Sequence, residues 1–530
     1  MNIYLAGITA TMIFYIIISS IISRKVRDAN DFYVSGRNAP AFLITGSLVA
    51  SFLSPEAFMG DVGEAYNGFF APVLIVVCIL SVGYIMGSVF FGRFLRRSEV
   101  ITIPQYFGKR FDSQAVKTLA TVTSIFTMTV YSLSCIQGVA SMMSLISGLE
   151  YNTCIIISVS VFTIITAFAG AKGVLITDTI MFGIFSAAAI IGVAFISHKA
   201  GGWVNAVKEM ASYKNIPGIL SWSGNLDYFY HTGRENIIWA LGYGVAWMAV
   251  LMVAPWQSSR YIMAKNEHAV IRSSIFASFS VFVIEFLMCM AGVFTQKLNP
   301  GMKVPSHALI WASMNIMPSI LGIIVLSGIL AAGISSATTF LSLISSNIVN
   351  DILNVKDGQK SILYGRLSII VLGIIICVLC ICQPPQIFWI VYLGATIIAC
   401  SWLPAAIASV WSKRVTKAGV FWGMLTGFIV SSVMKIGAAL ANVLLPIYFD
   451  SFFVGMLTSI IVMVIVSSFT QVTDKEKEKR EKLFIMPEKE KNAAEIKKTK
   501  LMIALSIPLG FVITGIMLFL WAIPYLEGLH

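Results

Sequence analysis

A group of hydroxyl side chains stands in the middle of a long apolar stretch. Ser335, Ser336, Thr338 and Thr339 lie almost side by side within residues 326–352. Hydroxyl oxygens and main-chain carbonyls are ligands that a small cation accepts inside hydrocarbon, and the small residues just before the serines would let another backbone approach. The same hydroxyls could instead bond to carbonyls one turn earlier, or join two helices. The stretch alone leaves both interpretations open.

The helix that carries these hydroxyls is one of fourteen apolar runs. The chain has 530 residues, of which 57% are hydrophobic and 12% charged. Repeated runs of about 20 apolar residues match a hydrocarbon core of ~30 Å. The runs lie at residues 3–23, 40–65, 70–92, 118–148, 153–169, 174–197, 237–257, 273–296, 318–349, 366–383, 387–411, 418–446, 452–470 and 501–523. We therefore predict an all-α, polytopic membrane protein with about 14 transmembrane helices.

The distribution of basic residues predicts the orientation. When the loops are assigned alternately to two sides, most of the 37 Lys and Arg residues fall on one side, including those of the charged loop at 472–500. The positive-inside rule makes that side cytoplasmic and places both termini outside, in the cell (plasma) membrane. The net charge of +12 then reflects topology, and we expect no nucleic-acid partner.

Enzymatic chemistry is not indicated by any motif. The five histidines are scattered, and the sequence contains no HExxH, GxSxG or P-loop pattern. We therefore expect a protein that is not an enzyme.

Two of the apolar runs contain helix-breaking residues. Pro55 in the second run should free main-chain carbonyls near residues 50–53. Gly242, Gly244 and Pro255 should interrupt the seventh run in the same way. Broken helices are tolerated at membrane depth where they line a cavity, and two of them five helices apart indicate an inverted repeat with a binding site between its halves.

A few charged residues lie within or near the apolar runs. They are Glu56, Asp61, Glu64, Asp178, Glu285 and Lys435. Each would cost a few kcal/mol if it faced lipid, so each should face the protein interior or water. Asp178 follows the turn at residues 170–173, where an acid in the first turn of a helix would suit the helix dipole. An ion-binding role for Asp178 is equally open.

Six stretches together resemble the sodium:solute symporter family. They are DFYVSGRNAPAFLITGSLVASFLSPEAFMG, GAKGVLITD, PWQSSRYIMAK, LAAGISSATTFLSLISSNIVNDI, and QPPQIFWIVYLG with VWSKRVTKAG. The resemblance covers nearly the whole chain. It implies a five-plus-five inverted-repeat core at residues 40–411, with broken first and sixth core helices. One leading helix lies within residues 1–39, and three more lie within residues 412–530 around the cytoplasmic loop.

The resemblance also implies a sodium site between the first and eighth core helices. Matched by position, its ligands are the carbonyls of Ala50, Leu53 and Ala332 and the hydroxyls of Ser335 and Ser336. Asp178 matches an aspartate that would assist sodium binding or form part of a second site.

The sequence indicates the solute less clearly than it indicates the sodium site. Ala57, Val76 or Val77, and Trp247 stand where sugar-carrying relatives use polar residues, which disfavours a sugar. The chain looks closer to the sodium/pantothenate and monocarboxylate branch, so we expect a sodium-coupled importer of a monocarboxylate or pantothenate-like acid. No Arg or Lys is expected near the site, so half-helix N-termini and hydroxyls would hold the carboxylate.

An alternative interpretation of the same residues is that the solute carries a positive charge. Glu56, Asp61, Trp247 and Trp256 would suit a zwitterionic or cationic solute, such as an amino acid or a choline-like molecule, unless they serve packing and gating. The candidate solute-binding residues are Ser54, Glu56, Phe58, Asp61, Trp247, Trp256 and Tyr392. A symporter-like sensor without transport is a further alternative. We expect a monomer or weak oligomer whose partners are the solute, sodium and the lipid bilayer.

Overall fold

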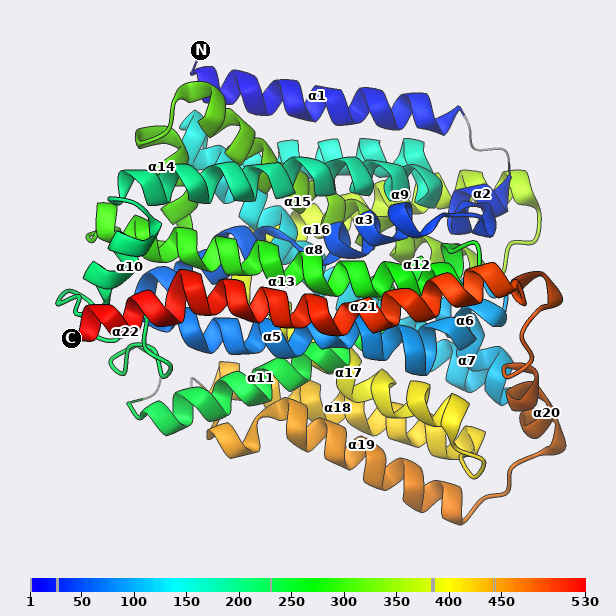
Figure 1. Cartoon of the computed structure of the whole chain (residues 1–530). Helices are drawn as coiled ribbons and strands as arrows, with labels where there is room; N and C mark the ends of the chain where they lie inside the picture. The colour runs from blue at the N-terminus through cyan, green and yellow to red at the C-terminus, as the bar shows by residue number, and fades with distance from the viewer. Residues whose placement is uncertain (1, 25–27, 229–230, 383–386, 442, 444) are drawn as a thin grey trace.

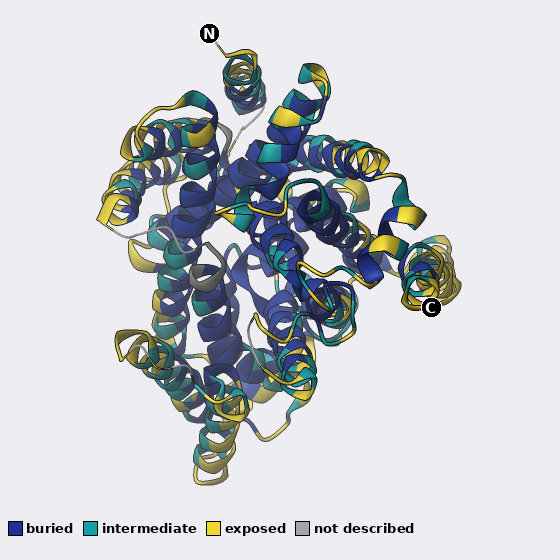
Figure 2. Cartoon of the chain, turned by 90° about the vertical axis from the view of Figure 1, so that its left-hand side faces the viewer, coloured by how far each residue is buried: buried dark blue, intermediate teal, exposed yellow. Residues whose placement is uncertain are grey.

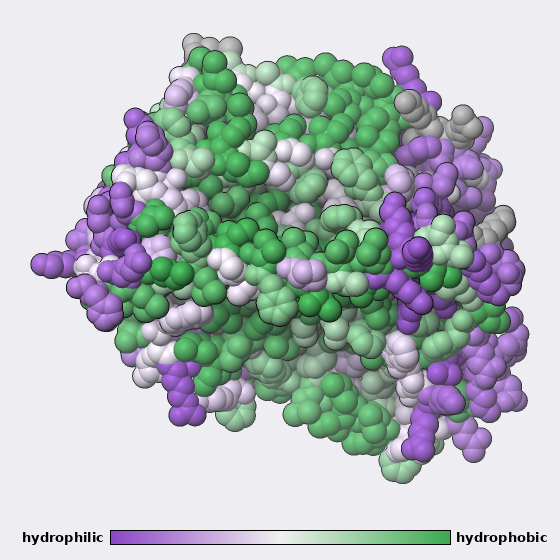
Figure 3. Space-filling model, in the orientation of Figure 1, coloured by the Kyte–Doolittle hydropathy of each residue, from purple (hydrophilic) through white to green (hydrophobic). Residues whose placement is uncertain are grey.

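The computed structural model describes residues 2–24, 28–228, 231–382, 387–441, 443 and 445–530. In this part of the chain the regular structure is helical, apart from an isolated β-bridge between Ala39 and Ala264. Thirteen of the described helices are long and apolar enough to cross a membrane. Figure 3 shows a hydrophobic band between two hydrophilic ends. The prediction of an all-α, multi-pass membrane protein is confirmed.

Figure 1 shows how the helices are arranged. In chain order they are α1 (Ile3–Ser23), α2 (Ala29–Val34), η1 (Ser35–Arg37), α3 (Ala41–Phe52), η2 (Glu56–Asp61), α4 (Val62–Glu64), η3 (Ala65–Phe69), α5 (Phe70–Gly87), η4 (Ser88–Gly92), α6 (Arg93–Arg97), α7 (Ile103–Phe111), α8 (Gln114–Ser147), α9 (Tyr151–Lys199), α10 (Trp203–Ala211), α11 (Gly233–Val253), α12 (Pro255–Met263), α13 (Glu267–Leu298), η5 (Pro305–His307), α14 (Ala308–Asn315), α15 (Ser319–Asn347), η6 (Ile348–Ile352), α16 (Gly358–Cys382), α17 (Ile387–Trp411), α18 (Lys417–Leu440), η7 (Ile447–Phe449), α19 (Ser451–Ser468), α20 (Asp474–Lys482), η8 (Glu488–Glu490), α21 (Ala493–Met517), η9 (Leu518–Ala522) and α22 (Ile523–Leu529).

The predicted second run is a broken helix. Its first half, α3, ends at Phe52, and Leu53 is extended with φ −65° and ψ 99°. Pro55 then opens the second half at η2, because a proline that lacks an N–H is tolerated at a helix start. This second half continues through a kink at Gly68, where φ is 95°, into α5. Gly68 therefore separates two helices, so the predicted run at 40–65 is the broken helix made of α3 and the segment from η2 to η3, and the predicted run at 70–92 begins at α5. The stretch Glu56–Arg97 counts as one of the thirteen long candidates because it is continuous across that kink.

The second predicted break lies at Ala254 and Pro255, between α11 and α12. The expected interruptions at Gly242 and Gly244 were wrong, since both glycines lie inside α11. Their role is close packing: a Cβ at Gly244 would lie 2.9 Å from Cβ of Ile79, and one at Gly242 would lie 2.9 Å from the Phe453 ring. Small residues allow membrane helices to approach in this way.

The helices that carry the site residues fill the interior of the bundle. Figure 2 shows buried residues in the middle and exposed residues on the outer helices. α15 contacts α3, α8, α9 and α12, whereas the outer helix α21 buries only Thr499. In Figure 1 the two termini lie at one end of the molecule and α20 lies at the other.

Candidate ion and solute site

The hydroxyl stretch of α15 faces the end of α3. The Ser335 hydroxyl donates a hydrogen bond to the Ala50 carbonyl, and the Ser336 hydroxyl lies 3.5 Å from the same oxygen. The Ser335 hydroxyl is also 3.4 Å from the carbonyl of Ala332. All four residues are fully buried. The structure thus brings together four of the five residues predicted to hold sodium.

Leu53, the fifth residue, lies at the break between the two half-helices. It is fully buried, and its N–H donates to the Val49 carbonyl at 2.9 Å. A Cβ at Gly333 of α15 would lie 3.3 Å from Pro55, so the break is in direct contact with the helix of the serines. The hydroxyl pair and the interrupted backbone therefore face each other across one helix contact.

Asp178 joins a buried hydrogen-bond network next to this contact. Ser47 donates to its Oδ2 at 2.5 Å, and the Arg260 guanidinium donates to the same oxygen at 3.0 Å. The other carboxylate oxygen, Oδ1, has no hydrogen-bond partner among the described residues. Because α9 turns at Gly170, Asp178 lies about two turns into the following helix. The interpretation that Asp178 lies in the first turn of a helix and favours the helix dipole is therefore wrong.

Arg260 is the residue that sequence reasoning misplaced. It was assigned to a cytoplasmic loop, and no Arg or Lys was expected near the site, but it lies in α12 and is only 2% exposed. Its guanidinium also contacts Ser47 at 2.6 Å and Thr339 at 2.5 Å. The available signals were its position five residues after Pro255 and the unpaired acid at Asp178.

The network and the hydroxyl pair are stacked along the same two helices. Ser47 precedes Ala50 by three residues on α3, and Thr339 follows Ser336 by three residues on α15. This offset is nearly one helical turn, a rise of ~5 Å. A cation at the hydroxyl pair would therefore lie close to the Asp178 carboxylate, while Arg260 balances the charge of that carboxylate.

Three acids of the broken helix, of which only Glu56 is buried, form a second group. Glu56 lies close enough to Asp61 for their charges to interact. Asp61 lies near Glu285 of α13, which is buried, and Glu64 lies near Tyr228. Within the described part of the chain, no Lys, Arg or His forms an ion pair with any of these acids.

Tyr131 of α8 connects several of the predicted solute-binding residues, although sequence reasoning did not select it. Its hydroxyl lies near Ser54 but has no hydrogen-bond partner among the described residues, and its ring centroid lies 5.2 Å from that of Trp256 in an edge-on contact. The charge of Glu56 also acts on Tyr131. Ser54, Glu56 and Trp256 are therefore grouped around one side chain.

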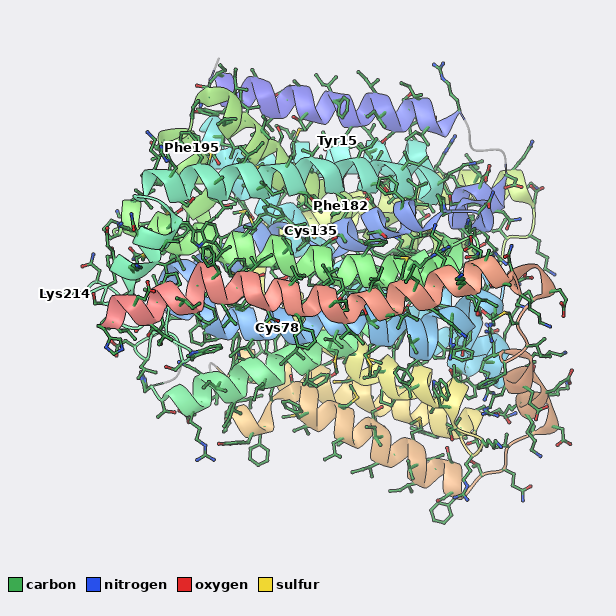
Figure 4. The ribbon with its side chains drawn as sticks, viewed as in Figure 1. Tyr15, Cys78, Cys135, Phe182, Phe195 and Lys214 are labelled. Carbon is green, nitrogen blue, oxygen red and sulfur yellow. The ribbon has the colours of Figure 1, made fainter. Side chains whose placement is uncertain are left out.

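Cys135, on the next turn of α8, approaches both groups. Figure 4 labels it among the central helices, and its thiol lies close enough to Ser336 and Glu56 for both to act on it. Sequence reasoning gave this thiol no role. The Cys135 side chain is therefore a neighbour of both Ser336 and Glu56.

The remaining aromatic candidates lie on different sides of this group. The ring of Trp247 is 5.7 Å from Phe52, and the ring of Phe58 is 5.8 Å from Phe185. Phe58 is fully buried against α9, so it serves packing in this structure.

The Tyr392 side chain also contacts charged residues outside the group of candidate solute-binding residues. Its hydroxyl donates to Asp450 at 3.0 Å, and the ammonium of Lys435 lies 4.0 Å from its ring centroid. Lys435, the membrane lysine left unexplained by the sequence, is 3.5 Å from Asp450. The Tyr392 ring centroid lies 4.4 Å from that of Tyr243, and the Tyr243 ring centroid lies 6.4 Å from that of Trp247. Tyr392 therefore joins the other candidates through Tyr243.

Comparisons with known proteins agree with this architecture. The model of the sodium:solute symporter family matches residues 32–427. Sodium/glucose cotransporter 1 of Ovis aries is 25% identical over 483 residues, covering 80% of this chain and 71% of that protein. The sodium/pantothenate symporter of Escherichia coli is 22% identical over 418 residues, covering 76% and 84%. The sodium/proline symporter of the same organism is 22% identical over 445 residues, covering 79% and 85%.

Solved structures share the fold. A substrate-bound, outward-open sodium-coupled sialic acid symporter matches with a TM-score of 0.71 at 19% identity, covering 89% of this chain and 99% of that chain. A nucleobase-cation-symport-1 family transporter in a closed conformation matches with a TM-score of 0.57 at 11% identity, covering 85% and 98%. The predicted inverted-repeat fold is confirmed by these neighbours.

Proposed function

This chain belongs to the sodium:solute symporter family, and we propose that it uses a sodium gradient to import a small organic solute. The sodium ion would bind where α15 meets the broken end of α3, at the carbonyls of Ala50, Leu53 and Ala332 and the hydroxyls of Ser335 and Ser336. The contact between Ser335 and Ala50 is the observation that carries this proposal. These five ligands are uncharged, as expected of an alkali-metal site in hydrocarbon.

Asp178 would support that ion from one turn away. Its free oxygen Oδ1 supplies negative potential, and its ion pair with Arg260 keeps the network close to neutral when the site is empty. Sodium would steady the break in the first core helix and so favour solute binding. Such coupling is reciprocal, so solute must raise sodium affinity by the same factor.

The second half of the other broken helix offers donors for a carboxylate. Trp256 and Ser258 begin α12, a nine-residue helix, and both are fully buried. The indole N–H of Trp256 and the hydroxyl of Ser258 have no hydrogen-bond partner among the described residues. Indole nitrogen can only donate, and a helix N-terminus favours negative charge. A monocarboxylate or pantothenate-like acid would be held here.

Glu56 favours a solute that also carries a positive charge. It is buried near Tyr131, whose ring contacts Trp256, and it has no ion pair in the described part of the chain. A simple monocarboxylate would leave this acid uncompensated, whereas a zwitterion would satisfy both ends of the site. We therefore place an amino-acid-like zwitterion ahead of the monocarboxylate.

Uptake into sealed vesicles tests the proposal. Pantothenate, lactate, acetate, proline, choline and galactose should be offered with and without an inward sodium gradient. Proline is the panel member that matches the site best, and its accumulation should require sodium. Accumulation against a gradient would exclude a sensor without transport, and accumulation that does not need sodium would overturn the proposal.

The topology is part of the same proposal. The charged segment around α20 would be cytoplasmic and both termini outside the cell membrane, consistent with their positions at opposite ends in Figure 1. The transport core would comprise residues 40–411, preceded by residues 1–39 and followed by residues 412–530. The protein would act as a monomer or weak oligomer.

A further inference from the structure

The charged segment between α19 and α21 contains buried residues. Within residues 473–499, which we call the strap, Glu476 is fully buried, and Leu483 and Glu490 are 6% and 8% exposed. Charged side chains are seldom buried unless they have partners. In Figure 1 the strap lies at the end of the molecule opposite the two termini, where α20 contacts α7. This is the end that the proposed topology places in the cytoplasm.

The first part of the strap is bound to α7, α17 and α18. The Glu476 carboxylate accepts a hydrogen bond from the main-chain N–H of Lys417 at 2.8 Å, and the Glu476 carbonyl accepts one from the Arg110 guanidinium at 3.0 Å. Arg480 donates to the carbonyl of Val410, near the end of α17, at 2.9 Å. Hydrogen bonds that involve a charged group are stronger than neutral ones. The strap therefore holds three helix ends on this side.

The later part of the strap is bound to α6 and α13. Arg97 of α6 donates to the Leu483 carbonyl at 2.8 Å, and it forms an ion pair of 2.5 Å with Glu267, the first residue of α13. The Glu490 carboxylate accepts from the N–H of Glu267 at 2.9 Å. The Glu490 carbonyl lies 3.0 Å from the His268 ring nitrogen. The Arg97 and Glu267 side chains are only 7% and 4% exposed, so this contact is largely closed to water.

The contact at α6 leads directly to the two half-helices of the site. Arg96, next to Arg97, donates to the carbonyls of Ala264 and Lys265, which follow the end of α12. Ala264 also forms the β-bridge with Ala39, just before α3 begins. The half-helices α3 and α12, which carry Ala50 and Trp256, are therefore joined at α6, one residue from the arginine that binds the strap.

Between these two sets of contacts the strap covers the junction of two groups of helices. α6 contacts α12 and α13, and α17 contacts α7 and α18. The Phe484 ring centroid lies 5.1 Å from that of Phe94 on α6 and 6.1 Å from that of Trp411 on α17. Arg480 and Leu483, which bind the two groups, are three residues apart, so the chain between them can span ~10 Å at most. Separating the two groups at this end must break the bonds to one of them.

We propose that the strap locks the cytoplasmic end of the transport core, and that its release from one group of helices lets the core open to the cytoplasm. Opening then moves α6, α12 and α13 away from α7 and α17, and the end of α12 gives water access to the site. The opening step rests on the proposed transport function. The closure of this end by the strap does not, because its contacts are present without sodium or solute.

Labelling of a buried thiol with a membrane-impermeant maleimide tests the strap without any transport. The reporter is Gln257→Cys, at a fully buried position between Trp256 and Ser258, in a chain that keeps Cys400 and has alanine at its other natural cysteines. Glu490→Ala frees the start of α13, and Arg480→Ala frees the end of α17. Each should speed labelling from the cytoplasmic face by ~10-fold or more, the change in population expected for one lost hydrogen bond to a charged group. Labelling from outside should not increase.

Two variants within the strap are matched controls. Glu488→Ala and Lys482→Ala remove exposed charges whose ion pairs, to Lys491 and Glu478, lie inside the strap. Both should label like the parent. Cys400 is fully buried and bonded to the Phe452 carbonyl, so it reports loss of the fold and should stay unlabelled.

Three results would overturn the proposal. They are an unchanged rate in Arg480→Ala, an equal increase from the two faces, and labelling of Cys400, since the last two mean that the strap only stabilises the fold. Arg480→Ala decides the matter if Glu490→Ala does not fold. In uptake experiments with proline, a loosened strap leaves fewer carriers open to the outside, so the external sodium concentration for half-maximal uptake should rise. If proline is not accumulated at all, the proposed function fails while the labelling still decides the role of the strap.

Discussion

The hydroxyl of Ser335 is hydrogen-bonded to the carbonyl of Ala50 although 285 residues separate them in the sequence. The carbonyl belongs to the last turn of α3, just before the chain becomes extended at Leu53. An interrupted helix leaves its final carbonyls without intrahelical donors, and a hydroxyl from another helix supplies one. A sodium ion bound between the two oxygens would replace that hydrogen bond, while the Ser335 hydroxyl keeps its proton and coordinates the ion through an oxygen lone pair.

The role of Asp178 in sodium binding can be tested with variants that remove its charge and that of Arg260. Asp178→Asn leaves the Arg260 guanidinium buried without a counter-charge, which should destabilise the protein by about 3–5 kcal/mol and raise the sodium concentration needed for half-maximal uptake. Thermal unfolding in detergent and sodium titration of uptake measure the two effects.

The double variant Asp178→Asn with Arg260→Gln separates the ionic role from the structural one. It removes both buried charges, so thermal stability should recover, while the sodium requirement stays high. If the sodium requirement also returns to that of the wild type, the acid serves only to hold Arg260.

The two ends of the solute site should respond to different solutes. Trp256→Phe removes the indole donor, and the loss of one hydrogen bond to a charged group, about 1.5–3 kcal/mol, should raise the KM for proline by ~10-fold or more. The sodium requirement should change little beyond the reciprocal coupling. Trp222→Phe, at an exposed tryptophan, is the matched control.

Glu56→Gln should weaken binding of proline but spare or improve binding of lactate, because only the zwitterion needs the negative charge. Competition by unlabelled lactate against labelled proline measures the difference. Equal losses for both solutes would argue that Glu56 does not contact the positive end.

The sequence predicted the features that local chemistry controls. Pro55 and Pro255 lack an N–H and begin the second halves of their helices, so both breaks could be located before the structure was known, although Pro404 and Pro508 lie inside helices. The hydroxyl stretch was equally visible because four hydroxyl residues, Ser335, Ser336, Thr338 and Thr339, fall within five positions of an apolar run. What α15 faces was indicated only by the family resemblance.

Features that depend on distant partners were missed. Arg260 is buried because Ser47, Asp178 and Thr339 from three other helices bind its guanidinium, and nothing in its own neighbourhood reveals this. The position of Asp61 near Glu285 and the central place of Tyr131 depend on contacts between helices in the same way. Gly242 and Gly244 were mistaken for breaks because glycine serves both breaks and close packing.

Close packing at Gly244 makes a prediction about stability. Gly244→Ala places a methyl group 2.9 Å from Ile79, and such overpacking should destabilise the protein by about 1–3 kcal/mol. Gly183→Ala is the matched control, since its Cβ would meet no atom within 4 Å. Thermal unfolding should show a lower Tm for the first variant only, and equal Tm values would mean that α5 and α11 are not in close contact.

The charged segment around α20 should detach in acid. Asp112, at the end of α7, contacts Lys479 at 2.6 Å, and this lysine holds the pKa of the Asp112 carboxyl below its usual value. A lowered folded pKa stabilises the contact above the unfolded pKa, and that stability is lost as the pH falls through the folded pKa. The protection of the amides in residues 474–482, measured relative to their intrinsic exchange rates at each pH, should therefore fall in acid and at high salt.

Asp112→Asn should show the low protection of the acid state already at neutral pH. Lys477→Ala is the control, because Lys477 pairs only with Asp474 of its own helix. Protection that does not depend on pH in the wild type would show that other contacts hold α20.

Binding of radioactive sodium to the purified protein, with Ser335→Ala and Ser336→Ala combined, tests the sodium site most directly. Two lost hydroxyl ligands at about 1 kcal/mol each should weaken binding by ~30-fold, and the sodium concentration for half-maximal uptake should rise in parallel. Ser345→Ala, on the same helix but hydrogen-bonded to Gly365, should bind sodium like the wild type. Unchanged sodium binding in the double variant would contradict the site between α3 and α15.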